Sequence, residues 1–189
     1  MTEVSSLTGR LLVATPALAD PNFDRAVVLL LDHDEEGSLG VVLNRPTPVD
    51  VGDILEGWGE LAGEPGVVFQ GGPVSLDSAL GVAVIPGGSS ERAPLGWRRV
   101  HGAIGLVDLE TPPELLAAAL GSLRIFAGYS GWGPGQLENE LTEGAWYVVE
   151  SEPGDVSATR PEGLWRAVLR RQRGELAMVA TYPDDPSLN

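Results

Sequence analysis

The residues whose types and spacing most suggest chemistry lie in one glycine-rich stretch, GYSGWGPGQLENEL, at residues 128–141. A nucleophile elbow has the pattern G-x-S-x-G, which begins at Gly128 but fails at Trp132, a bulky residue where the turn needs a small one. A dinucleotide-binding loop has the pattern G-x-G-x-x-G, which from Gly131 requires a glycine where Gln136 stands. A phosphate-binding P-loop needs a lysine, and the chain has none. The stretch therefore matches none of these motifs.

Two interpretations of the same stretch remain. A strand, a glycine turn and a helix N-terminus form a geometry that binds anions through main-chain N–H groups. Glu138 and Glu140 would lie in the first turn of that helix, where their charges already complement the helix dipole and repel a phosphate. We therefore favour a shaped loop, in which glycines permit positive φ angles and Trp132 covers part of the core. Whether Trp132 lies in the core or faces a partner stays open at this point.

The two histidines, His33 and His101, are far apart in the sequence and lack the spacing typical of a metal site. The chain also has no cysteine, which excludes thiolate metal sites, iron–sulfur clusters, disulfides and thiol catalysis. We expect no metal and no cofactor. His33 lies in the acidic segment DHDEEGS, residues 32–38, which predicts a solvated side chain in a turn. A catalytic triad of Ser130, His33 and an aspartate has no local support in the sequence.

Two further segments carry polar residues next to predicted strands. In the segment DPNFDR, Asp20 and Arg25 either frame a polar pocket beside Phe23 or form turns and ion pairs above it. In the segment NRP, Arg45 is either a ligand clamp or an internal ion-pair partner. Together with the glycine-rich stretch, these segments predict a ligand or partner site without catalytic residues. Its candidate members are Asp20, Phe23, Arg25, His33, Asn44, Arg45, Gly128, Ser130, Trp132 and Gln136.

The formal net charge of the chain is −15, and all twelve of its basic residues are arginine. A net negative field opposes the approach of DNA, RNA or anionic lipid, because proteins bind these ligands largely by neutralising their phosphates with basic side chains. The absence of lysine also excludes Schiff-base chemistry. The one concentration of basic residues, four arginines within residues 166–173, complements the C-terminal dipole of a predicted helix. Direct nucleic-acid binding is therefore not expected.

The length and the N-terminus indicate a single domain, residues 1–189, in a cytoplasmic protein. A chain of 189 residues buries enough surface to fold without disulfides or metals. Its first residues lack the basic segment and the continuous apolar core of a secretory signal. The longest apolar run, residues 26–31, is too short to cross a bilayer, and we expect no membrane partner.

Hydrophobic runs bounded by glycine, proline and aspartate predict more strands than helices. The predicted strands cover residues 11–14, 25–32, 39–44, 67–70, 80–85, parts of 98–107, 123–129, 145–150 and 178–182. The predicted helices cover residues 50–58, 111–121, 135–142 and 161–171, and a surface loop covers 85–96. The segment 111–121 has the strongest helix signals, because Thr111 and Glu114 form a capping box and Gly121 ends it. Strands with irregularly interposed helices indicate an α+β or mixed α/β fold with a strongly bent sheet.

Four blocks of the sequence together resemble the AlgH (YqgE-like) family of bacterial proteins. They are GRLLVATPALADPNFDRAVVLLLDHDEEGSLGVVLNRP at 9–46, GGPV at 71–74, RIFAGYSGWGPGQLENEL at 124–141 and LWRAVL at 164–169. The resemblance covers residues 9–171, and the string GWGPGQLE is its most specific part. It implies a single α/β domain in which a bent, bifurcated sheet folds into a pseudo-barrel with a few flanking helices. Ala26 departs from the pattern, which commonly has a hydroxyl residue after the arginine.

The resemblance implies no established catalytic residue, because the family is largely uncharacterised and some members are described as transcriptional regulators, chiefly of alginate synthesis. The favoured hypothesis is a non-enzymatic regulatory or interaction protein, acting through an unidentified protein partner or small ligand, with a surface patch near Trp132. The second hypothesis is an enzyme or small-molecule binder with a pocket near the 20–25 and 128–136 loops. The third, direct DNA binding, is opposed by the net charge.

Overall fold

The structure is a computed structural model, which describes residues 6–18, 20, 21, 23–86 and 94–181. Its strands are β1 (Leu11–Ala14), β2 (Val27–Asp34), β3 (Gly37–Val42), β4 (Pro46–Asp50), β5 (Val67–Gln70), β6 (Val74–Val84), β7 (Trp97–His101), β8 (Ile104–Val107), β9 (Ser122–Trp132) and β10 (Trp146–Val149). Its helices are α1 (Val51–Ile54), α2 (Pro113–Leu116), α3 (Gln136–Thr142), α4 (Pro153–Val156), the 3₁₀ turn η1 (Pro161–Gly163), α5 (Leu164–Arg170) and α6 (Glu175–Val179).

One strand, β9, joins the two parts of the sheet. The strands hydrogen-bond in the order β10, β1, β2, β3, β9, β6, β8, β7, and β4 and β5 lie off this path. One edge of β9 pairs with β6. Its other edge is divided, because β5 pairs in parallel at Phe126 and Ala127 whereas β3 pairs antiparallel from Ser130 to Trp132. The sheet is therefore bifurcated and curled, and the mixed α+β fold predicted from the sequence is confirmed.

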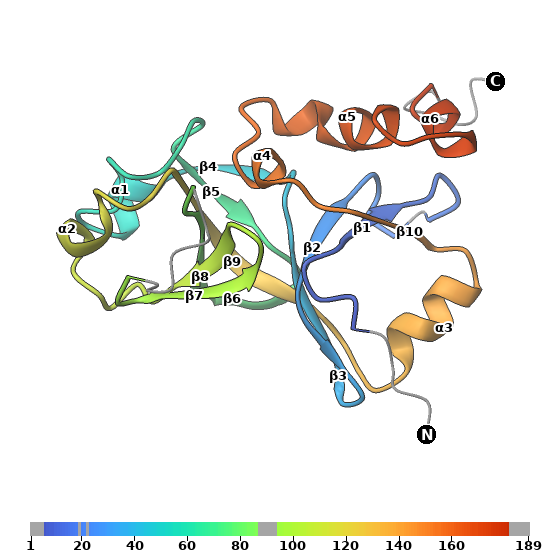
Figure 1. Cartoon of the computed structure of the whole chain (residues 1–189), viewed down its shortest axis with the longest axis horizontal. Helices are drawn as coiled ribbons and strands as arrows, with labels where there is room; N and C mark the ends of the chain where they lie inside the picture. The colour runs from blue at the N-terminus through green and yellow to red at the C-terminus, as the bar shows by residue number, and fades with distance from the viewer. Residues whose placement is uncertain (1–5, 19, 22, 87–93, 182–189) are drawn as a thin grey trace.

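The helices cover different parts of this curled sheet (Figure 1). α5 and α6 form a C-terminal layer beside β1 and β10, α4 lies nearer the middle of the molecule and contacts β6, and α1 and α2 lie together at the opposite end, beyond β5 to β8. α3 contacts β3 and β10. The C-terminal layer is tied to the sheet by Trp165 of α5, whose indole N–H donates to the carbonyl oxygen of Ala14 in β1 at 2.8 Å. The first strand of the chain is thus covered by a helix that follows it about 150 residues later.

The apolar run 26–31 is buried on both of its faces. Val27 and Leu29 point into one core, which lies between the sheet and the C-terminal layer. Val28 and Leu30 point into a second core, which includes Trp132 and Trp146. Strands that are buried on both faces have continuous apolar sequences, not alternating ones. A third core fills the end of the molecule near α1 and α2.

Two buried charged groups hold the C-terminal layer. Asp155 is 3% exposed, and its carboxylate accepts two hydrogen bonds from Arg171, at 2.6 and 2.7 Å. The hydrogen bond to Asp155 raises the pKa of Arg171 above its ordinary value. Arg124 of β9 is 2% exposed and donates to the carbonyl oxygens of Glu64 and Ala158, at 3.0 and 2.9 Å. Burial lowers the pKa of Arg124 to about 10, so this side chain is still a cation at neutral pH.

Three predicted elements differ from those in the structure. The helix predicted over 111–121 is a single turn, α2, whose N-cap Pro112 makes no side-chain hydrogen bond. Leu116 is its one buried residue, and a helix stripe this narrow gains little stability from packing despite its strong local signals. The last strand predicted at 178–182 is replaced over its first residues by the helix α6, and Tyr182 lies outside the described residues. The helix predicted over 50–58 is also shorter, since α1 ends at Ile54.

The turn predicted over 32–38 is much tighter than its composition suggests. Asp34 pairs with Gly37, so only Glu35 and Glu36 lie between β2 and β3. His33 is consequently a strand residue and is 4% exposed, which corrects the expectation of a solvated side chain. Most of the loop predicted over 85–96 lies outside the described residues. Within the described part of the chain, no helix is long and apolar enough to span a membrane.

Candidate functional site

The glycine-rich stretch forms the end of β9 and the start of α3, and its side chains meet at one carboxylate. Glu140 accepts hydrogen bonds from the indole N–H groups of Trp132 and Trp146, at 3.1 and 2.9 Å, and from the amide of Gln136, at 3.0 Å. Both indoles also contact the ring of Phe23, with centroid distances of 6.2 and 5.5 Å. Trp132 is 5% exposed, so it belongs to the core and forms no surface patch. We call these five residues the Glu140 cluster.

Beside this cluster, a hydroxyl, an imidazole and a carboxylate lie in series. The Nδ1 atom of His33 is 2.6 Å from the hydroxyl oxygen of Ser38, and its Nε2 atom is 3.3 Å from a carboxylate oxygen of Glu138. The connectivity is that of a nucleophile, a base and an orienting carboxylate. Ser130 takes no part, because it is fully buried and its hydroxyl donates to the carbonyl oxygen of Gly71 at 3.1 Å.

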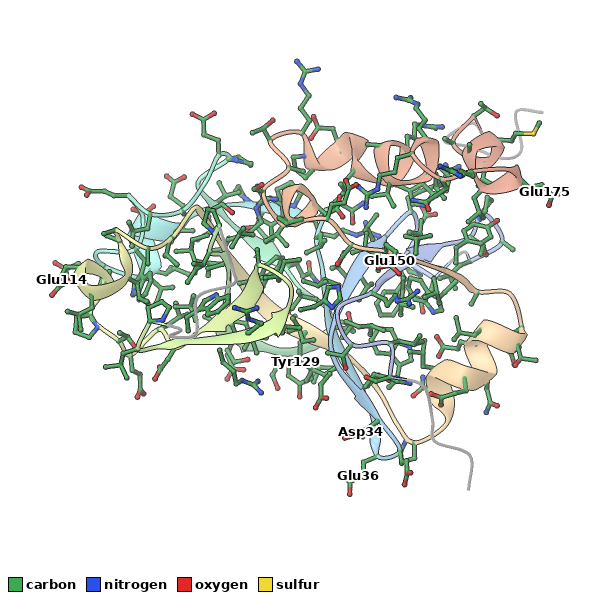
Figure 2. The ribbon with its side chains drawn as sticks, in the orientation of Figure 1. Asp34, Glu36, Glu114, Tyr129, Glu150 and Glu175 are labelled. Atoms are coloured by element: carbon green, nitrogen blue, oxygen red, sulfur yellow. The ribbon has the colours of Figure 1, made fainter. Side chains whose placement is uncertain are left out.

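The surroundings of Ser38 are strongly acidic. Ser38 lines a cleft of about 240 Å³ together with Asp32, Asp34, Glu36, Gly37, Leu39 and Trp132. Figure 2 shows Asp34 and Glu36 at the tip of the β2–β3 hairpin, where their side chains extend into solvent. Acyl transfer develops negative charge on an oxyanion, and carboxylates around the nucleophile raise the energy of that charge. Among the described residues, no three histidine, aspartate or glutamate side chains are placed to hold a metal ion.

A second region is built around the bend that precedes β2. Asn44 holds this bend in place, because its amide donates to the carbonyl oxygen of Arg25 at 2.9 Å and its Oδ1 accepts from the N–H of Val27 at 3.0 Å. Arg25 has a φ angle of +58°, a conformation that non-glycine residues adopt only when their surroundings fix it. Its guanidinium lies over the ring of Trp165, 4.1 Å from the ring centroid. The bend is therefore rigidly attached to both the sheet and the C-terminal layer.

Arg45, next to this bend, lines a small cleft of about 130 Å³. Its other lining residues are Pro21, Val42, Gln70, Gly72 and Pro73, and we call it the Arg45 cleft. The Nη2 atom of Arg45 donates to the main-chain carbonyl oxygen of Asp24 at 2.6 Å, and among the described residues Arg45 makes no ion pair. The lining contains no carboxylate, whereas three other clefts in the described part of the chain each contain aspartate or glutamate.

The floor of the Arg45 cleft depends on glycine. A Cβ atom added at Gly72 would collide with the Tyr129 carbonyl and with the hydroxyl oxygen of Ser130. Gly128 has a φ angle of +73°, and a Cβ atom there would lie 2.8 Å from the Gly72 carbonyl oxygen. The chain at Gly72 can therefore lie against β9 only because Gly72 and Gly128 have no side chains. Figure 2 labels Tyr129, which lies on β9 near the middle of the molecule.

A family model described as AlgH-like matches residues 11–177. The chain belongs to the AlgH-like family. It is 90% identical over 190 residues to a UPF0301 protein of Streptomyces coelicolor, covering 100% of this chain and 98% of the relative. A crystal structure from Corynebacterium diphtheriae matches this AlgH-like fold with a TM-score of 0.89, at 31% identity and with 96% and 95% of the two chains covered. The solution structure of AlgH from Pseudomonas aeruginosa matches with a TM-score of 0.67, at 29% identity and with 97% of each chain covered.

In this AlgH-like chain, the ten candidate residues fall into four groups instead of one pocket. Arg45 lines the cleft named after it, with Asn44 and Arg25 holding the adjoining bend and Asp20 preceding the lining residue Pro21. Gly128 and Ser130 lie beneath Gly72 and Gly71. Phe23, Trp132 and Gln136 belong to the Glu140 cluster, and His33 contacts Ser38 and Glu138.

Sequence reasoning missed several residues that matter in this AlgH-like site. Gln70, Gly72 and Pro73 were not candidates, although the block GGPV was part of the family resemblance and adjoins Gln70. The sequence predicts that Glu140 complements the dipole in the first turn of the helix, whereas its carboxylate accepts hydrogen bonds from Trp132 and Trp146. The available signal was the position of Glu140 between two tryptophans that both need an acceptor for a buried indole N–H.

Proposed function

We propose that this AlgH-like protein is a non-enzymatic binding protein, which exerts a regulatory effect through a protein partner or small ligand held at the Arg45 cleft. An influence on transcription would be indirect, exerted in the cytoplasm by the bound partner or ligand. Direct contact with DNA is disfavoured by the net charge of −15. The basic group at 166–173 adds little to DNA affinity, because Arg171 is paired with Asp155 and Arg166 donates to the Ala180 carbonyl oxygen.

The observation that supports this proposal most directly is that Arg45 makes no ion pair among the described residues. A cation that is buried is almost always paired with a carboxylate, and this chain has 27 acidic residues available for such a pair. Arg45 is half-buried, yet among the described residues its one hydrogen bond is to the main-chain carbonyl oxygen of Asp24. A guanidinium that is held in place but not neutralised favours pairing with a group from another molecule.

Affinity capture from native lysate tests the proposal. We expect Arg45→Gln to recover at least about tenfold less of the bound protein or small ligand than the wild type, because the variant loses the charge. Arg98→Gln is the matched control, since Arg98 also lines a cleft and is exposed on β7. Equal recovery by all three proteins would contradict the proposal. Trp132→Ala is unsuitable for this purpose, because Trp132 is buried and its loss would alter folding.

Hydrolysis by Ser38 is the second candidate function, because the series formed by Ser38, His33 and Glu138 has the connectivity of a triad. The carboxylates of Asp32, Asp34 and Glu36 line the same cleft and oppose an oxyanion there.

We therefore expect no labelling of Ser38 when the protein is treated with a fluorophosphonate probe, as measured by intact mass. Ser38→Ala, which lacks the candidate hydroxyl, sets the background. A mass increase that is lost both in Ser38→Ala and in His33→Gln would establish an activated nucleophile and overturn the non-enzymatic proposal.

A further inference from the structure

The chemistry of the Arg45 cleft is specific enough to suggest what kind of group enters it. A guanidinium has five N–H donors, and Arg45 uses one of them for the carbonyl oxygen of Asp24. Four donors are then left without a protein acceptor among the residues that the structure describes. Asp24 meets Arg45 through its main chain and not through its carboxylate, so the charge of Arg45 is not neutralised there. A planar guanidinium in this state matches a carboxylate, which accepts two parallel N–H bonds.

The volume of the cleft limits the size of the group that enters. Pockets for complete small-molecule ligands usually have volumes of about 300–1,000 Å³. The Arg45 cleft has about 130 Å³, which is several times the share of one liquid water molecule, about 30 Å³, and is comparable to one amino-acid side chain. Pro21, Val42 and Pro73 supply apolar walls for the methylene groups of such a side chain. The cleft therefore suits one residue of a larger molecule.

Exposed aliphatic side chains lie next to the cleft. The segment that leaves it, residues 73–76, includes Val74 and Leu76, which are 37% and 53% exposed. Leu76 lies beside the floor of the cleft, because its Cδ2 atom would be 3.0 Å from a Cβ atom added at Gly128. The Gly72 carbonyl oxygen would lie 2.8 Å from the same added Cβ atom, so Leu76 and Gly72 are close to each other. An apolar side chain close in sequence to the bound carboxylate would contact this segment.

From these three observations we infer that the Arg45 cleft binds the carboxylate of a glutamate or aspartate side chain on a partner polypeptide. An aliphatic residue near that carboxylate in the partner packs against residues 73–76. This inference rests on the proposed binding function and names the partner chemistry. The negative charge of the rest of the chain opposes an acidic partner, but at physiological salt charges more than about 8 Å apart are largely screened. The contact between the partner's carboxylate and Arg45 is direct, so this attraction acts within the screening distance.

Titration of the ¹⁵N-labelled protein with blocked peptides tests the inference by NMR. The probes are Ac-Ala-Leu-Ala-Glu-Ala-NH₂, the same peptide with glutamine in place of glutamate, and N-acetylglutamate methylamide as a single-residue acid. We expect the glutamate peptide to shift the resonances of Gly71, Gly72 and the Nε–H of Arg45. Its dissociation constant should be at least about tenfold lower than that of either other probe, since each lacks one of the two contacts.

Variants of the cleft decide whether this selectivity comes from the proposed contacts. Arg45→Gln should bind the glutamate and glutamine peptides equally, whereas Arg98→Gln should keep the wild-type preference. The amide resonances of β10, which is more than seventy residues from any lining residue in the chain, report whether each variant has kept its fold. Equal binding of the two peptides by the wild type, or no shift at the cleft, would overturn the inference.

Two outcomes separate this inference from the proposed function. Arg45-dependent capture from lysate, together with peptides that bind equally, would keep the binding function and reject a carboxylate as its ligand group. Binding of N-acetylglutamate methylamide as tightly as the glutamate peptide would reject a polypeptide source, because residues 73–76 would then contribute nothing. Capture that does not depend on Arg45 would reject both.

Discussion

Glu140→Ala should destabilise the protein by about 3–5 kcal/mol, because it removes a charged acceptor shared by two nearly buried indole N–H groups. Trp132 and Trp146 are 5% and 4% exposed, and both donate to the same oxygen atom of Glu140. Urea unfolding followed by tryptophan fluorescence measures the loss of unfolding free energy directly.

Two variants sharpen this test. Glu143→Ala changes an exposed acid just beyond α3 that makes no side-chain hydrogen bond or ion pair among the described residues, and it should alter the unfolding free energy by less than about 0.5 kcal/mol. Glu140→Gln keeps the shape and one acceptor oxygen, so it should lose less than the alanine variant. If Glu140→Ala were as stable as Glu143→Ala, the Glu140 cluster would not be what fixes the loop.

Asp155→Ala should cost about 1–3 kcal/mol, because it removes the carboxylate that accepts two hydrogen bonds from Arg171, which keeps only the exposed carboxylate of Glu152, at 3.1 Å, as an ion-pair partner. The side chain of Asp155 is 4% exposed, and its carboxylate also accepts the N–H of Glu152 at 2.7 Å. The loss should be concentrated in the C-terminal layer. Hydrogen exchange is therefore expected to accelerate in α5 more than in β2, alongside the lower midpoint of chemical unfolding.

Arg170→Ala serves as the matched control for this prediction, since Arg170 is an exposed arginine on the same helix and should be nearly neutral. The double variant Asp155→Ala, Arg171→Ala should lose less free energy than the sum of its two single variants, because the two side chains hydrogen-bond directly to each other and either single change removes the same interaction. Additive losses would show that the pair does not act as a unit in holding the layer.

The interior of the sheet was largely predictable from local sequence. The run 26–31 is apolar at every position, and the structure buries it on both faces. The helix at 161–171 was also predicted, because Leu164, Trp165 and Val168 recur at helical spacing and all three are buried in α5. In both segments the local pattern and the tertiary packing favour the same element. The helix predicted at 111–121 had only the local pattern, and it forms a single turn.

The candidate site was less predictable, because its residues meet across long sequence separations. Arg45 comes from the end of the β2–β3 hairpin. It meets Gln70 and Gly72 because the main chain of residues 42–45 hydrogen-bonds to Gln70 and Gly71, which in turn pair with β9. His33 shows that the burial of a side chain depends on where a strand ends. In a strand, neighbouring side chains point to opposite faces, so extending β2 to Asp34 places His33 inside and leaves Asp32 exposed.

By itself, the sequence determined the fold class of this protein and several kinds of chemistry that its residues cannot perform. Its apolar runs specify a strand-rich fold, its lack of lysine and cysteine removes whole classes of chemistry, and the string GWGPGQLE indicates the AlgH family. Only the tertiary structure decided that Trp132 is a core residue bound to Glu140 and that Arg45 lines an acid-free cleft. The physical reason is that side-chain type and periodicity encode which positions are buried. The partner of each polar group depends on how distant strands pair.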